Sequence, residues 1–236
     1  MILFSFRLGN IARSRRKWGA CLAALCVELA LSVSLEAGSE VSPERNTAAR
    51  DFDLYQRGHW EFSLESTYSF CVISNPFHSI YSMRVIARNP IDYHFASQLL
   101  AVRYRLTNAG GPWWLRGSLQ SSATLVGTTI LNGPESYFLG LALGLRYDFV
   151  QVNARLVPFI EMRGGPGTTN SDGRRYAEQQ DLVFTYLASA GLRYDISRRW
   201  SATLSAIDQH LSNAHLAPEN WGVDSLGVSL GFFARF

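Results

Sequence analysis

The stretch YFLGLALGLRYDF, residues 137–149, decides how the rest of the sequence is interpreted. Its odd-numbered positions carry large apolar side chains, with leucines in the middle and aromatic residues at both ends. Apart from Phe138, its even-numbered positions carry glycine, alanine and charged residues. A period of two predicts a β-strand with one apolar and one polar face. A leucine band between aromatic residues is typical of a strand whose apolar face lies against lipid.

The same alternation recurs along most of the chain. Hydrophobic residues make up 47% of the sequence and charged residues only 17%, yet after the first forty residues no stretch is apolar over the ~20 residues that a membrane helix needs. We therefore predict an all-β fold, an eight-stranded antiparallel transmembrane β-barrel of the outer-membrane type. The predicted strands are 58–73, 91–106, 112–124, 136–149, 154–163, 181–195, 199–212 and 223–236.

The predicted connections alternate in length. Those after the first, third and fifth strands are long, and the GGPG cluster at 164–167 is interpreted as part of a loop. Short periplasmic turns and long outer loops are typical of outer-membrane barrels, so both chain ends are predicted on the periplasmic side. Trp113 and Trp114 are interpreted as residues of an aromatic girdle.

The polar faces of the predicted strands carry charges of both signs. Eight strands enclose a lumen that side chains just fill, so these charges should pair and close it, and a pore is not expected. The predicted inward set is Glu61, Glu65, Arg146, Arg155, Glu161, Arg163 and Arg193.

The N-terminus has the pattern of an export signal. A basic segment precedes an apolar run that ends near Ala37, which predicts a signal peptide over 1–37, a periplasmic linker or cap over 38–57 and the barrel over 58–236. Residues 1–37 hold the chain's whole net charge of +3, so the remainder is neutral and no nucleic-acid partner is expected. Cys71 is the only cysteine after residue 37, which excludes a disulfide within the mature chain.

The stretch HLSNAHL, residues 210–216, breaks the apolar face of the seventh predicted strand. By parity, His210 and Ser212 point toward lipid near the outer end, and Asp224 does so at the start of the eighth strand. A neighbouring imidazole activates a serine hydroxyl, and a carboxylate orients that imidazole. Asn213 and the backbone N–H of the following turn, at Ala214, are candidate oxyanion donors. These groups predict an esterase whose substrate is a lipid.

The end of the chain resembles the outer-membrane lipid A 3-O-deacylases. Their His-x-Ser-Asn motif matches His210 to Asn213, and the glycine and acid that follow it match Gly222 and Asp224. The family's acid is usually glutamate, and Glu219 in the preceding loop is the alternative acid here. The resemblance covers roughly residues 199–236. It implies an acyl-ester hydrolase, comparable to an acyloxyacyl hydrolase, that cleaves the 3-position acyl ester of lipid A in lipopolysaccharide, with Ser212 as nucleophile and His210 as base.

Two other functions remain open at this stage, a non-catalytic small barrel for adhesion or membrane integrity and an esterase acting on phospholipids. No cofactor is expected, and no metal-ligand spacing is present among the histidines. His215 is interpreted as a loop residue. The expected location is the outer membrane of a Gram-negative-type bacterium, and the sequence leaves open whether two barrels form a homodimer.

Overall fold

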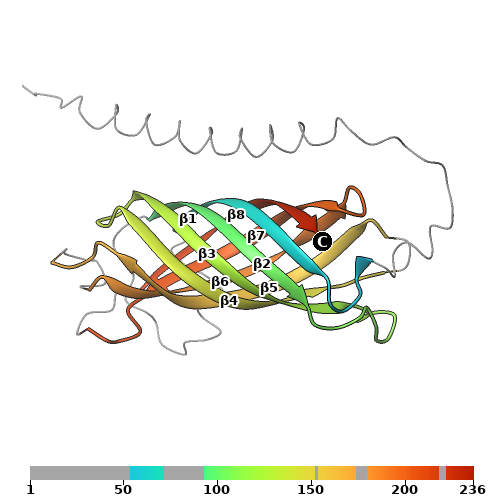
Figure 1. Cartoon of the computed structure of the whole chain (residues 1–236). Helices are drawn as coiled ribbons and strands as arrows, with labels where there is room; N and C mark the ends of the chain where they lie inside the picture. The colour runs from blue at the N-terminus through green and yellow to red at the C-terminus, as the bar shows by residue number, and fades with distance from the viewer. Residues whose placement is uncertain (1–53, 72–92, 152–153, 174–179, 218–221) are drawn as a thin grey trace, which may run out of the picture. The chain divides into compact units, whose positions relative to one another are not determined.

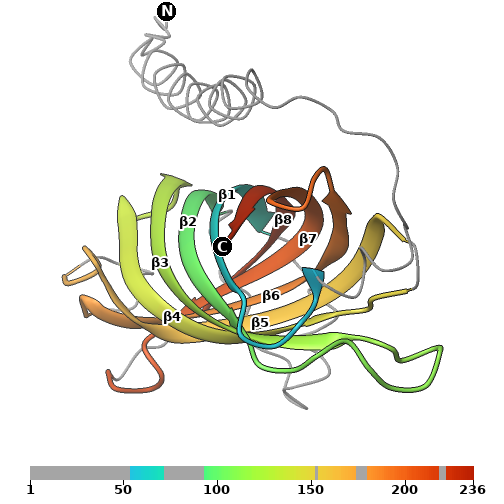
Figure 2. The same cartoon turned by 45° about the vertical axis from the view of Figure 1, so that its right-hand side comes forward.

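The computed structural model is an eight-stranded antiparallel β-barrel, closed by pairing of β1 with β8 (Figures 1 and 2). It describes residues 54–71, 93–151, 154–173, 180–217 and 222–236. The predicted signal peptide over 1–37 and most of the predicted linker over 38–57 lie outside these residues. The strands are β1 Trp60–Cys71, β2 His94–Arg105, β3 Ser118–Asn132, β4 Tyr137–Asp148, β5 Leu156–Thr169, β6 Leu182–Asp195, β7 Trp200–Ser212 and β8 Val223–Arg235.

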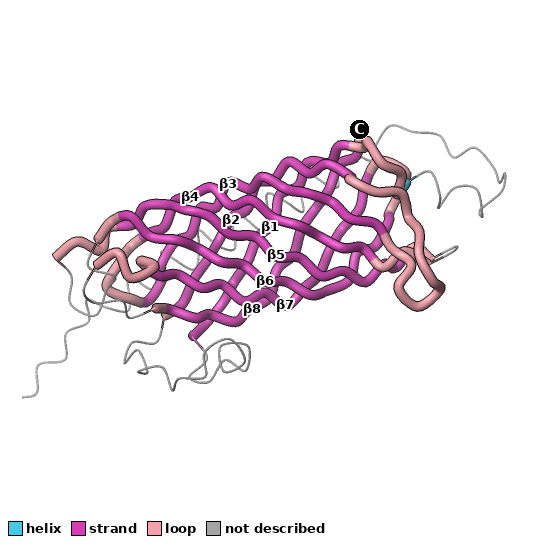
Figure 3. Tube along the Cα trace, turned by 90° about the horizontal axis from the view of Figure 1, so that it is seen from below, coloured by secondary structure: helices cyan, strands magenta, loops and turns pink. Residues whose placement is uncertain are grey.

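Closure pairs each strand with both neighbours, as a wall surrounded by lipid requires. The strands of the near wall cross those of the far wall in Figure 3, as tilted strands of a closed barrel do. Where β1 begins and β8 ends we speak of the terminal end, and of the far end at the other side. Among the described residues, no helix has the length and hydropathy that a membrane span requires.

The alternation in the sequence becomes an outer and an inner face. In β4, Leu139, Leu141, Leu143 and Leu145 are about half-exposed on the outside, whereas Ala142, Arg146 and Asp148 are buried in the lumen. The same division holds in β1, where Phe62 is exposed and Glu61 and Glu65 are buried. The predicted fold class and the predicted faces of these strands are confirmed.

The predicted bounds of the third strand, 112–124, are wrong. β3 covers Ser118–Asn132, so the connection before it is long (106–117) and the one after it is short (133–136). The alternation of loop lengths is therefore incorrect at both places, and Trp113 and Trp114 lie in the long connection, not in a strand. Residues 125–132 mix aliphatic, glycine and polar residues on both faces, so they show no clear alternation in the sequence. Pairing with β2 and β4 holds them in the wall.

The GGPG cluster lies inside β5 and not in a loop. A Cβ atom at Gly167 would come within 2.5 Å of the Phe138 ring, and one at Gly165 within 2.0 Å of the Leu141 carbonyl oxygen, so side chains have no room there. Pro166 sits where the pairing of β4 with β5 is interrupted, and its missing N–H therefore leaves no ladder bond unmade. These glycines, which resemble a turn signal in the sequence, are therefore explained by close packing of β5 against β4.

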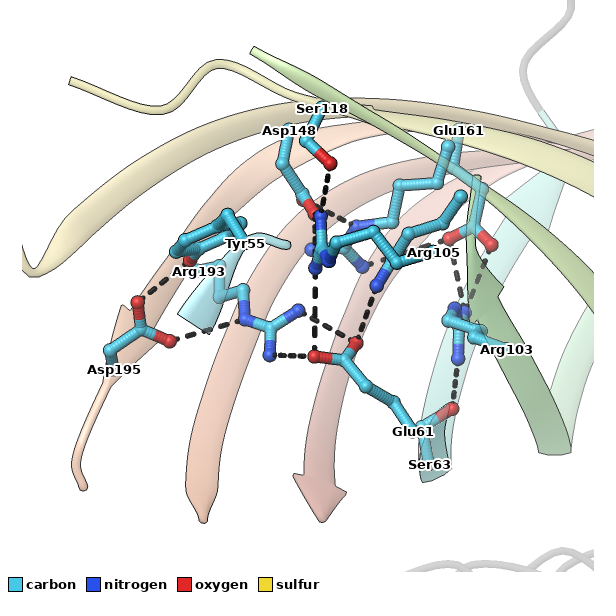
Figure 4. Close-up of polar contacts among 12 residues, drawn as sticks. Tyr55, Glu61, Ser63, Arg103, Arg105, Ser118, Asp148, Glu161, Arg193 and Asp195 are labelled. Carbon is cyan, nitrogen blue, oxygen red and sulfur yellow. Dashed lines mark hydrogen bonds and ion pairs between the residues drawn. The ribbon is translucent and has the colours of Figure 1, made fainter. Parts of the chain in front are cut away.

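The lumen near the terminal end is filled by ion pairs (Figure 4). Glu61 accepts two hydrogen bonds from Arg193, at 2.9 and 2.6 Å, one from Arg235 Nε at 3.0 Å, and one from the Gln120 amide at 2.9 Å. Asp195 accepts bonds from Arg193, Arg235 and Tyr55. Glu61 thereby joins β1 to β3, β6 and β8 across the interior.

A second group of charges lies beside the first. Arg103 donates to Glu65 at 2.8 Å and to Glu161 at 2.9 Å, and Arg163 donates to Glu65 at 3.0 Å. Arg155 was placed in this inward set wrongly, because it precedes β5 and is exposed. Parity in the observed strands adds three buried arginines that the predicted inward set omits: Arg103, Arg105 and Arg235.

Residues just before β1 cover the terminal end of this network. Tyr55 is 1% exposed, donates to Asp195 Oδ2 at 2.7 Å and packs against the Arg105 guanidinium. Burial raises the pKa of Tyr55, so its phenol stays protonated and remains a donor. Toward the far end the lumen is apolar instead, lined by a cluster that includes Phe95, Leu187 and Leu211.

We predict that Glu61→Gln lowers the free energy of unfolding in lipid vesicles by about 3–5 kcal/mol, because it leaves buried arginines without their counter-charge. Arg155→Gln is the control, since its exposed side chain lies outside the network, and it should change stability by no more than about 0.5 kcal/mol. Urea unfolding followed by tryptophan fluorescence measures both. Equal stability of the two variants would show that the lumenal ion pairs do not hold the barrel together.

Candidate active site

The site is built on the outer face of β7. Ile207, Gln209 and Leu211 are buried in the lumen, at most 5% exposed. His210 and Ser212 alternate with them and are partly exposed on the outside. Both predicted residues therefore stand on the lipid side of the wall, at the far end of the strand.

Register brings the acid beside the imidazole. β7 and β8 pair so that His210 lies opposite Asp224, and His210 Nδ1 is 2.8 Å from Asp224 Oδ1. A carboxylate only accepts hydrogen bonds, so Nδ1 is the protonated nitrogen and the lone pair of the neutral ring is on Nε2. That is the tautomer a general base needs, and the shorter aspartate side chain reaches the ring. Glu219, the alternative acid, lies outside the described residues.

Ser212 lies next to His210 on the same face. Alternate residues of a strand are about 6.6 Å apart along it, a span that an imidazole and a hydroxyl can close by side-chain rotation. Among the described residues the Ser212 hydroxyl makes no hydrogen bond, and its neighbour across β6 is Phe184. The serine is thus placed beside the imidazole, with an apolar residue on its other flank.

Asn213 shapes the turn after β7. It is completely buried, its Oδ1 accepts a bond from the His215 N–H at 2.8 Å, and its carbonyl oxygen accepts one from Leu216 N at 3.0 Å. Because Oδ1 is the acceptor in this turn, Nδ2 is the donor end of the amide. His215 belongs to this turn, as expected of a loop residue.

The turn has an unusual backbone. Ala214 and His215 have φ angles of 54° and 62°, a left-handed conformation that costs about 1–2 kcal/mol in a residue other than glycine. The Ala214 N–H has no acceptor among the described residues. A strained turn that presents an N–H donor two residues after a serine is suited to stabilising an oxyanion.

Three neighbours complete the surroundings of His210. The sequence matches Gly222 to the motif glycine but assigns no role to Tyr186 or Gln209. Tyr186 lies directly opposite His210 on β6. Gly222 has a φ of 55°, and a Cβ atom there would come within 3.4 Å of His210 Cε1, so glycine lets the chain pass close to the ring. Gln209 reaches across the lumen to Ser97 on β2 and Thr128 on β3, at 2.9 and 3.1 Å. A polar residue between Ile207 and Leu211 on an inward face is the signal that could have identified Gln209.

The outer wall beside the site also holds an open groove. It has a volume of about 480 Å³ and lies over β4 and β5, with Tyr186 at its border nearest His210. Gly164 pairs with both Leu143 and Tyr186, so a residue without a side chain separates two large ones. The apolar lining includes Leu143, Leu145, Ile160, Met162 and Tyr186.

Residues 98–233, more than half of the chain, match the family model described as lipid A 3-O-deacylase (PagL). No curated protein matches the sequence.

Several solved outer-membrane structures are similar at low identity. The crystal structure of the outer membrane enzyme PagL matches with 20% identity and a TM-score of 0.45, over 72% of this chain and 97% of that one. Neisserial surface protein A matches with 11% identity and a TM-score of 0.49, over 76% and 97%. OprG from Pseudomonas aeruginosa matches with 11% identity and a TM-score of 0.38, over 77% and 97%. On the strength of the family model, the chain belongs to the lipid A 3-O-deacylase (PagL) family of outer-membrane ester hydrolases.

Proposed function

We propose that this protein hydrolyses the 3-O-acyl ester of lipid A with Ser212 as nucleophile, His210 as general base and Asp224 as the group that orients the imidazole. The observation that carries the proposal is the 2.8 Å contact between His210 Nδ1 and Asp224 Oδ1 on the lipid-facing wall. In the lumen these groups would meet no lipid, whereas on this face they meet an ester that arrives sideways from the membrane.

The first half of the reaction transfers the acyl chain to the enzyme. His210 Nε2 takes the proton of the Ser212 hydroxyl as Oγ attacks the ester carbonyl carbon. The Asn213 amide and the Ala214 N–H donate to the oxyanion that forms. The tetrahedral intermediate then expels the sugar 3-oxygen, which receives the proton from the imidazolium.

The second half releases the acyl chain. His210 takes a proton from a water molecule as the water oxygen attacks the acyl-serine carbonyl carbon. The tetrahedral intermediate then expels Ser212 Oγ, which receives that proton from the imidazolium, so a free fatty acid and the intact serine result. Asp224 stabilises the imidazolium in both halves through the Nδ1 hydrogen bond. All of these groups come from β7, β8 and the turn between them, so one copy of the barrel carries the complete reaction.

Location follows the family, since these enzymes act in the outer membrane. We further propose that residues 1–37 act as the export signal that directs the chain there. The far end, which carries the site, then faces the cell exterior.

We expect Ser212→Ala to reduce 3-O-deacylation by at least about 10³-fold, because the nucleophile is lost. Mass spectrometry of lipid A from outer membranes that contain the wild type or the variant measures this loss. Ser121→Ala, at a partly exposed serine on β3, is the matched control and should retain full activity. If wild-type membranes keep their 3-linked acyl chain while their phospholipids are cleaved, the substrate is a phospholipid; if both lipids stay intact, the barrel is not an esterase.

Asp224→Asn should lower kcat by about 10³- to 10⁴-fold, because an amide can donate to Nδ1 and stabilise the wrong tautomer. Asp224→Glu keeps the acceptor and should stay within about tenfold of the wild type. Initial rates on purified lipid A in detergent micelles compare the two. Equal rates for Asp224→Asn and the wild type would remove the carboxylate from the mechanism.

Asn213→Asp tests separately the two roles of Asn213, which are to accept a hydrogen bond in the turn and to donate one to the oxyanion. The aspartate retains an oxygen that accepts from the His215 N–H, but it replaces the Nδ2 donor by a negative charge. We expect kcat to fall by more than about 10²-fold, with folding preserved, as judged by the heat-modifiable electrophoretic mobility of the barrel. An unchanged kcat would show that Asn213 only shapes the turn.

A further inference from the structure

A polar pair lies on the lipid-facing wall away from the active site. Ser66 of β1 donates its hydroxyl to Gln98 Oε1 of β2 at 2.8 Å, and the two residues are direct partners across the strands. The chain neighbours of Gln98, Ser97 and Leu99, are buried in the lumen, at 1% and 0% exposure. Gln98 therefore points outward.

The pair lies within the apolar band of the wall. Trp60 and Tyr104, whose rings are 4.9 Å apart, mark one border of the band on β1 and β2. Tyr68 and His94, joined by a contact of 3.0 Å between Oη and Nδ1, lie toward the other border. Between these borders hydrocarbon offers no acceptor, and an amide without a partner is costly there.

The NH₂ group of Gln98 carries two hydrogen-bond donors that the contact with Ser66 does not use. That contact engages Oε1 of the amide, which accepts from the Ser66 hydroxyl. Among the described residues no atom accepts a hydrogen bond from this NH₂ group. The neighbouring position on β3 is Gly127, where an added Cβ atom would meet no atom closer than 3.9 Å. The amide thus stands beside bare backbone that another protein surface can approach.

We propose that the outer face around Ser66, Gln98 and Gly127 is the contact surface between two copies of this chain related by a two-fold axis. A carboxamide is its own complement: in such a pair each NH₂ donates to the second lone pair of the other copy's Oε1. Small residues that let backbones approach and side chains that bond across the contact are what membrane interfaces select.

A second copy fits this surface better than lipid does. Acyl chains have no acceptor, and the ester and phosphate oxygens of lipids lie at the membrane boundary, outside the band that holds Gln98. The contact uses β1, β2 and β3, whereas His210 and Asp224 are on β7 and β8. Both active sites of the pair therefore stay open to the membrane, so the interface goes beyond the proposed function and does not depend on it.

Cysteine cross-linking in lipid vesicles tests the position of the contact. In a full-length background with Cys21→Ser, Cys26→Ser and Cys71→Ser, Gln98→Cys should form a disulfide-linked dimer rapidly when a copper–phenanthroline oxidant is added. Leu192→Cys is the control, because Leu192 is exposed on β6, four strands from β2 and so on the opposite wall. Cross-linking of Gln98→Cys no faster than Leu192→Cys would overturn the proposal.

Energy transfer between donor- and acceptor-labelled copies, diluted into increasing amounts of lipid, tests the amide itself. We expect Gln98→Leu to raise the dissociation constant of the dimer by about tenfold. Deacylation by the variant should equal that of the wild type, because Gln98 takes no part in the reaction. A dissociation constant unchanged by Gln98→Leu, or a wild type that shows no energy transfer at any dilution, would contradict the pairing.

Discussion

Backbone N–H and C=O groups in a wall that faces lipid must find their partners within the wall, and every other feature of this barrel depends on that requirement. Closure of β1 on β8 meets it and leaves each strand one register with its neighbours. A slip of one residue would turn the apolar face of a strand inward. The same register sets His210 opposite Asp224. The geometry of the site is therefore a consequence of how the wall is closed.

The lumen and the outer wall have opposite tasks. Inside, Glu61 and Glu65 bind arginines from several strands, and apolar side chains fill the far end. These contacts hold the wall from within, and Gln209 extends them to the part of β7 that carries His210. Outside, the proposed catalytic groups stand on this braced surface. Rigid support from the lumen allows a site on the outer wall to keep its geometry without contacts from the membrane.

Much of the fold could be predicted because lipid imposes a period of two on each crossing strand. The outward placement of His210, Ser212 and Asp224 followed from parity alone, and the structure places them there. The prediction failed where the pattern is weak. Residues 125–132 lack a clear alternation and yet are part of β3. The glycines of 164–167 are part of β5, where Phe138 and the backbone of β4 occupy the space of side chains. Arg155 was assigned to the lumen because the start of its strand was misjudged.

The sequence by itself determined the class of the fold, the two faces of its strands and the residues that carry the proposed chemistry, because each of these depends on local alternation or on a short motif. Only the tertiary structure decided that Asp224 reaches His210, that Asn213 holds the turn through His215, and that Gln209 joins β7 to β2 and β3. The first contact depends on the register of β7 with β8, the second on the backbone of one turn, and the third on the closure of the barrel. None of these is specified by the alternation of residues along a strand.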